Sequence, residues 1–147
     1  MAERGGPPDH VEGQELEKLK TEAEIESFVR KHCNARRGLN DVINSWLAAG
    51  RITASELLKK SRINRNYGYN IVNGKRLNPG RDKILAICVA AELNVRETQE
   101  TLAISRVGAL YARDERDVRI AGALNNRVGD VLKVNIMLAE HGLDPLE

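Results

Sequence analysis

Residues 52–76 of the chain read ITASELLKKSRINRNYGYNIVNGKR and contain the signals that decide the fold. Thr53, followed three positions later by Glu56, forms the capping-box pattern that begins a helix. Asn64 is a favourable N-cap for a second helix over residues 64–72. The stretch therefore predicts two short helices joined by a tight turn, with one polar helix face free for a partner.

The excess positive charge of the chain gathers around this helix pair. Residues 51–81 hold eight bases and one acid, Glu56, for a net charge of +7, whereas the whole chain of 147 residues is at +2. Residues 1–28 are at −5, residues 29–50 at +3 and residues 82–147 at −3. Positive charge concentrated in one helical segment predicts a polyanionic partner. The eight bases are Arg51, Lys59, Lys60, Arg62, Arg65, Lys75, Arg76 and Arg81.

The remaining sequence also predicts helices. Aromatic residues make up only 3% of the chain, so the core has to be aliphatic, which suits packed helices. Prolines are confined to positions 7, 8, 79 and 145, which permits long helices between them. No segment shows β-type alternation, so the expected class is all-α. Helices are expected over 15–32, 40–49, 53–61, 64–72, 82–93, 95–104, 114–125 and 128–141.

Composition divides the chain into four parts. Residues 1–12 contain a Gly-Gly-Pro-Pro run and are expected to be a disordered N-terminus. Residues 13–34 are expected to form an acidic N-terminal helix. Residues 38–105 hold the helix pair within one domain, and residues 106–147 form a two-helix C-terminal extension. This extension is more apolar than a solvated tail needs, so it buries against the domain or against a second chain in a homodimer.

Six pieces follow one another along residues 53–94. They are the capped helix Thr53–Leu58, the turn Ser61–Ile63, the polar helix Asn64–Ile71, the ending Asn73–Arg76, Pro79 and the apolar helix Lys83–Leu93. As a set they resemble the lambda-repressor-like helix-turn-helix family, of Cro/CI or XRE type. The resemblance implies a five-helix core whose polar helix enters the DNA major groove. It also implies a sequence-specific transcriptional regulator that binds double-stranded DNA.

Three positions depart from the family pattern. Arg62 stands where the turn usually has glycine, and Leu58 stands where the first helix usually has alanine. Gly68 stands in the polar helix where an aliphatic residue is usual. Gly68 could let the polar helix approach its neighbour closely and make room for Leu58. It could also mean that the fold is kept while DNA reading is lost, since fold alone does not settle function.

Carried over by position, the resemblance places base-reading side chains at Arg65, Asn66 and Asn70. These residue types suit the role, because arginine pairs with guanine and asparagine with adenine in the major groove. Contacts to the DNA backbone are expected from neighbouring hydroxyls, amides and cations. They fall on Ser55, Tyr67, Tyr69, Asn73, Lys75 and Arg76.

A second interpretation is a protein–protein interaction adaptor on a repurposed helix-turn-helix scaffold. Gly68, the modest total charge and the acidic N-terminal helix motivate it. That helix could bind a protein partner or cover the basic segment. Salt dependence discriminates the two interpretations, because binding through DNA phosphates weakens steeply with salt and an apolar protein interface does not.

Other classes of protein lack the residues that they need. Cys33 and Cys88 form no disulfide framework or zinc ligand set and fit a reducing cytoplasm, with Cys88 expected in the core. The three histidines lack metal-ligand spacing, so no metal or cofactor is expected, and no catalytic constellation predicts an enzyme. The sequence has no run of 18 apolar residues, so no membrane span is predicted. Its first residues lack the apolar region of a signal peptide.

Overall fold

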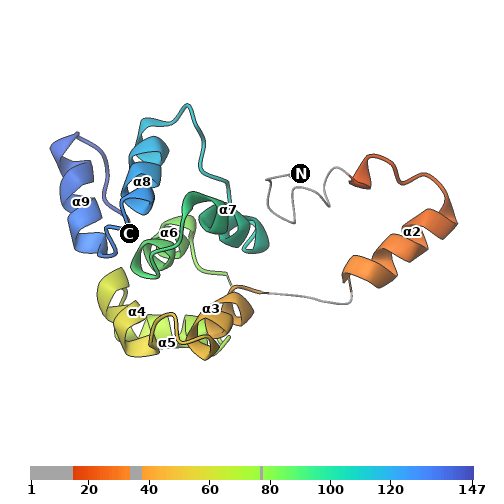
Figure 1. Ribbon diagram of the computed structural model, residues 1–147, viewed down its shortest axis with the longest axis horizontal. Helices are drawn as coiled ribbons and strands as arrows, with labels where there is room; N and C mark the ends of the chain where they lie inside the picture. Colours follow the sequence, from red (N-terminus) through yellow and green to blue (C-terminus); the bar gives the residue numbers. More distant parts are fainter. Residues whose placement is uncertain (1–14, 34–37, 77) are drawn as a thin grey trace.

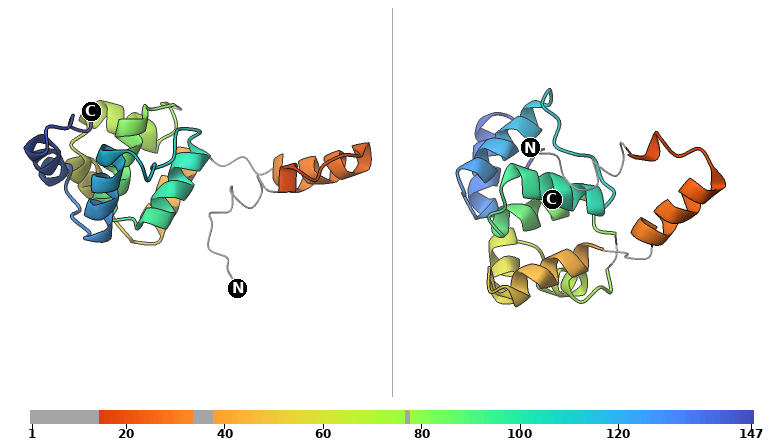
Figure 2. Two further views of the ribbon diagram at one scale, coloured as in Figure 1. Left: turned by 90° about the horizontal axis from the view of Figure 1, so that it is seen from above. Right: turned by 45° about the vertical axis from the view of Figure 1, so that its right-hand side comes forward.

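The computed structural model describes residues 15–33, 38–76 and 78–147, and every regular element in these ranges is a helix. The all-α class is therefore confirmed, whereas the expectation for residues 1–12 lies outside the described residues. Most helices form one bundle, and α2 stands apart from it (Figure 1, Figure 2). The elements are α2 (Glu22–Phe28), the π-helical η1 (Val29–Cys33), α3 (Leu39–Ala48), α4 (Ala54–Ser61), α5 (Arg65–Val72), α6 (Arg81–Ala90), α7 (Val95–Ile104), α8 (Glu115–Asn125) and α9 (Val131–Glu140).

Side-chain caps begin both helices of the predicted pair. The Glu56 amide donates to the Thr53 hydroxyl at 3.1 Å, and the Thr53 amide donates to the Glu56 carboxylate at 3.3 Å. This confirms the predicted capping box. Asn64 accepts a hydrogen bond from the Tyr67 amide at 3.2 Å and begins α5, as predicted. The start of each helix therefore follows from three or four adjacent residues.

The N-terminal helix is shorter than the prediction of residues 15–32. α2 begins at Glu22, because Thr21 has an extended backbone and closes a capping box with Glu24. The T-x-x-E pattern that identified α4 is therefore present here too, and it was overlooked in setting this boundary. Beyond α2 the chain continues as the π-helix η1, and no residue of α2 is buried.

Two further helix starts differ from the sequence-based expectation. Gly38 is the N-cap of α3, while Asp41 is the third helical residue and accepts a hydrogen bond from the Gly38 amide at 3.0 Å. α9 begins at Val131 and not at residue 128. Gly129 has a left-handed φ of +71°, which interrupts the helix, and Asp130 then caps its start. Turn conformation and not hydrophobic periodicity sets this boundary.

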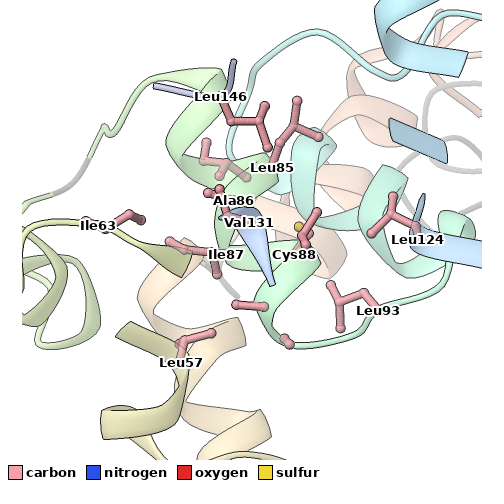
Figure 3. Close-up of a cluster of buried hydrophobic side chains, with 14 of the residues drawn as sticks. Leu57, Ile63, Leu85, Ala86, Ile87, Cys88, Leu93, Leu124, Val131 and Leu146 are labelled. Atoms are coloured by element: carbon pink, nitrogen blue, oxygen red, sulfur yellow. The ribbon is translucent and has the colours of Figure 1, made fainter. Parts of the chain in front are cut away.

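α6 is the centre of the bundle. Residues 84–91 are all buried, and a helix that is apolar on every side has to be surrounded by other elements. α4, α7 and α9 pack against it. Figure 3 shows Leu57 of α4, Leu124 of α8, Val131 of α9 and Leu146 of the C-terminal tail gathered around this helix. The helix pair and the C-terminal extension therefore share one core.

The C-terminal extension packs against the domain. Ile120 of α8 and Leu138 of α9 are fully buried in the cluster that surrounds α6. Arg116 of α8 donates two hydrogen bonds of 3.0 and 2.9 Å to Asp82 at the start of α6. Of the two alternatives for the extension, burial against the domain accounts for most of its apolar side chains. Three large apolar side chains of α8 and α9 are nevertheless exposed: Val118, Leu132 and Ile136.

Candidate nucleic-acid interface

The turn between α4 and α5 is held from outside the helix pair. Arg62 ends α4 in a left-handed conformation, with φ 61° and ψ 23°, which costs a non-glycine residue about 1 kcal/mol or more. Its guanidinium donates two hydrogen bonds to the carboxylate of Asp130, at 3.2 and 3.0 Å. Asp130 also caps α9, so the ion pair ties the turn to the C-terminal extension. The arginine at this turn position therefore has a specific contact.

Gly68 and Leu58 are matched where α5 packs against α4. Both residues are buried. A Cβ added to Gly68 would clash with Cδ2 of Leu58 and would lie 3.3 Å from its Cγ. The missing side chain is what lets α5 approach α4 over a leucine, which confirms the expectation that Gly68 makes room for Leu58. Two of the three departures from the family pattern are thus one compensated change in packing.

The exposed face of α5 carries the three residues predicted to read bases. Arg65, Asn66 and Asn70 are all exposed, and the buried residues of α5 lie on its opposite face. The guanidinium carbon of Arg65 lies 5.4 Å from the centroid of the Tyr69 ring, so the arginine stacks along the helix surface. Arg65, Asn66 and Asn70 together present one guanidinium and two amides, which are groups able to make paired hydrogen bonds.

Tyr67 lies at the edge of this face and contacts two cations. Arg76 lies over its ring, 4.9 Å from the centroid, and donates from Nε to its hydroxyl at 3.2 Å. The Nζ atom of Lys83, from the start of α6, lies 5.6 Å from the same centroid. Lys83 was absent from the predicted site, because the helix around it was interpreted as core. Its signal is the single lysine at the start of a strongly apolar run.

The loop after α5 folds back onto that helix. The Arg76 amide donates to the Asn70 carbonyl at 2.8 Å, and the Lys75 amide donates to the Asn73 side chain at 3.0 Å. Asn73 and Lys75 are exposed, so the loop brings three of the predicted backbone contacts beside α5. Ser55 is also exposed but belongs to the first turn of α4, on the other helix of the pair.

Half of the bases counted in residues 51–81 form ion pairs with acids that follow them in the sequence. These pairs are Arg51–Glu97, Lys60–Glu92, Arg62–Asp130 and Arg81–Asp117. The +7 of this segment therefore overstates the charge that it offers to a partner. Within the described parts of the chain, the bases of the segment that have no ion pair are Lys59, Arg65, Lys75 and Arg76. Three of these four bases lie on α5 or in the loop that follows it in the sequence.

The ion pairs also shift pKa values. Hydrogen bonds from Arg51 hold the pKa of Glu97 below its ordinary value, and those from Arg62 do the same for Asp130. Both carboxylates therefore keep their charge to lower pH. No acidic residue occurs between positions 57 and 81. The cations of α5 and its loop thus have no acid beside them within residues 57–81.

Metal-binding side chains are scattered through the chain. In the described residues, no group of three or more His, Cys, Asp and Glu side chains could hold a metal ion. Among the same residues, none of the helices has the length and apolar character needed to cross a membrane. Cys88 is buried, as predicted, and burial raises the pKa of its thiol to about 12.

No protein-family model, curated protein or solved structure matches the chain.

Proposed function

We propose that the chain is a sequence-specific DNA-binding transcriptional regulator that places α5 in the major groove of double-stranded DNA. The observation that carries the proposal is the distribution of unneutralised charge. Four bases of residues 51–81 are consumed by ion pairs, and three of the other four lie on α5 or its loop. Charge that the fold leaves unpaired beside an exposed polar helix fits a partner that is itself a polyanion.

The side chains divide into two roles in this proposal. Arg65, Asn66 and Asn70 read base edges, because they are exposed on one face of a helix narrow enough for the major groove. Backbone contacts come from groups beside that face, which fix the register of the helix on the duplex. These groups are Ser55, Tyr67, Tyr69, Asn73, Lys75, Arg76 and, in addition, Lys83. The regulator acts in the cytoplasm without a cofactor and without catalysis.

A titration with duplex DNA tests the proposal. Fluorescence anisotropy of a random labelled duplex, measured at two salt concentrations, should show binding that weakens steeply as salt rises. After selection of a preferred sequence, Arg65→Ala should cost about 1–3 kcal/mol and relax preference at one base pair. Lys75→Ala should weaken all sequences alike and lower the salt slope by about one unit.

Arg96→Ala is the matched control for these variants. Arg96 is exposed on α7, away from α5, so its loss removes the same charge without touching the proposed interface (Figure 1). Binding should remain close to that of the unmodified chain. If Arg65→Ala and Arg96→Ala had equal effects on affinity and on sequence preference, α5 would not be the reading helix.

A protein–protein adaptor is the second candidate, and α2 is the observation that favours it. Ile25 of α2 and Val29 at the start of η1 are exposed although α2 is well capped. If the chain fails to bind duplex DNA even at low salt, this candidate becomes the leading one, and binding to its protein partner should depend little on salt. A homodimer through the C-terminal helices is compatible with either function, and on DNA it would present two α5 helices to two half-sites.

A further inference from the structure

α2 presents an apolar stripe to solvent. Ile25 of α2 and Val29, the first residue of η1, are one helical turn apart and are 39% and 40% exposed. Helical spacing places Glu22 and Glu26 along one side of this stripe and Glu24 on the other. A short helix with no buried residue is only marginally stable in water, even with a good cap. α2 therefore has the properties of a helix that is stabilised by packing its apolar side chains against another surface.

A groove of about 680 Å³ lies between α8 and α9. Its apolar lining includes Val118 and Gly122 from α8 and Val134 and Met137 from α9. Val118 is 49% exposed, and a Cβ added to Gly122 would meet nothing within 4 Å. The small residue leaves room for an apolar side chain to approach the α8 backbone. Grooves of this kind accept the apolar face of an amphipathic helix.

The rim of the groove carries unneutralised positive charge. Arg113 and Lys133 are exposed at the rim, and neither has an ion pair within the described ranges. The acids of the rim are already engaged, because Asp114 caps α8 and Glu115 forms an ion pair with Arg119 at 2.9 Å. An acidic amphipathic helix is therefore a better electrostatic match for this groove than a basic one.

We propose that the apolar stripe of α2 docks in the α8–α9 groove of a second copy of this chain. α2 holds three acids, Glu22, Glu24 and Glu26, and no base, so the helix offers negative charge to the rim, and Arg30 and Lys31 follow it in η1. α2 lies on one side of the bundle in Figure 1, and α8 and α9, which line the groove, lie on the other. The groove of another copy is therefore the more accessible one.

Reciprocal docking about a two-fold axis gives two identical helix–groove contacts. Each copy then covers both of its unpartnered apolar surfaces, and no further protein is needed. The inference does not depend on what α5 binds, and no DNA enters its test. A failure here therefore leaves the proposed regulator untouched, and a failure of DNA binding leaves this interface untouched.

Sedimentation velocity of the full chain over a range of concentrations tests the inference. The unmodified chain should form a dimer. Gly122→Leu, which fills the groove from open space, and the double variant Ile25→Asp/Val29→Asp should each weaken it by about tenfold or more. Ile136→Asp is the matched control, since Ile136 is 53% exposed on α9 but does not line the groove. The control should dimerise like the unmodified chain, and circular dichroism should show that all variants remain folded.

A mixing experiment identifies which surfaces meet. Cys33 is exposed just after α2, whereas Cys88 is buried, so a maleimide fluorophore labels the end of this helix selectively. The labelled Gly122→Leu chain keeps an intact α2, and the unlabelled Ile25→Asp/Val29→Asp chain keeps an intact groove. Mixing the two should therefore restore one contact per pair and raise the anisotropy of the label, although neither variant dimerises well alone.

Three results would overturn the inference. The first is a chain that stays monomeric at every concentration with a freely rotating label. The second is a dimer that both variants leave intact, which would place the interface elsewhere. The third is a monomer whose label is immobile and is released by Gly122→Leu, because α2 would then dock in the groove of its own chain.

Discussion

Replacing Gly68 with alanine tests how closely α4 and α5 are packed. In an unconstrained helix this change is stabilising by about 1 kcal/mol. Here the new methyl group would clash with Cδ2 of Leu58 and lie 3.3 Å from its Cγ, and Leu58 is itself only 7% exposed. Overpacking of a core costs about 1–3 kcal/mol. We therefore expect Gly68→Ala to lower the free energy of unfolding by up to about 2 kcal/mol.

The double variant with Leu58→Ala tests the cause. Alone, Leu58→Ala should cost about 2–5 kcal/mol, because it removes a buried side chain and leaves a cavity. With Gly68→Ala in the same chain, the new methyl group occupies part of that cavity and the gain in helix propensity is recovered. The double variant should therefore be more stable than the sum of the single effects predicts, by about 1–3 kcal/mol.

Urea unfolding followed by helical circular dichroism measures these free energies. Gly122→Ala is the matched control, since it is the same change within a helix where a Cβ meets nothing within 4 Å. It should raise stability by up to about 1 kcal/mol. If Gly68→Ala stabilised the chain as much as this control, or if the double variant were additive, the contact between Gly68 and Leu58 would not limit the approach of the helices.

Three further predictions concern the ion pairs. Asp117→Asn leaves the Arg81 guanidinium without its buried counter-charge and should cost about 3 kcal/mol in urea unfolding, whereas an unchanged value would mean that the pair contributes nothing. Because the pKa of Glu97 is lowered in the folded chain, its contribution is full at neutral pH and is lost as pH falls through that lowered pKa. The Glu97→Gln variant should therefore have a lower Tm than the unmodified chain at neutral pH, and its Tm should fall less on acidification. Tm curves that run parallel for the two chains would contradict this. The Arg62→Ala variant keeps the left-handed backbone strain and loses the ion pair with Asp130, whereas Arg62→Gly loses the strain as well as the ion pair. The glycine variant should therefore have the higher Tm. The reverse order would show that backbone strain does not matter at this position.

Local chemistry is the part of this fold that the sequence predicts well. Thr53 and Asn64 begin their helices through hydrogen bonds to amides three residues away, so no distant element is needed to place them. The exposure of Arg65, Asn66 and Asn70 follows in the same way, because helical spacing puts them opposite the buried side of α5. The predicted start of α9 was wrong for a related reason. A left-handed turn before it competes with hydrophobic periodicity, and periodicity alone does not register turns.

Charge is the part that adjacent residues do not determine. Within residues 113–119, Arg119 pairs locally with Glu115, whereas Asp117 binds Arg81 and Arg116 binds Asp82, each more than thirty positions away. Such pairs exist only after the chain has packed α6 against the extension. The excess of acids in residues 82–147 and much of the excess of bases in residues 51–81 thus belong to the same contacts. Among the residues that the structure describes, the bases of residues 51–81 without an ion pair are Lys59 and three bases on α5 or its loop. These unpaired bases are the reason to test α5 against DNA.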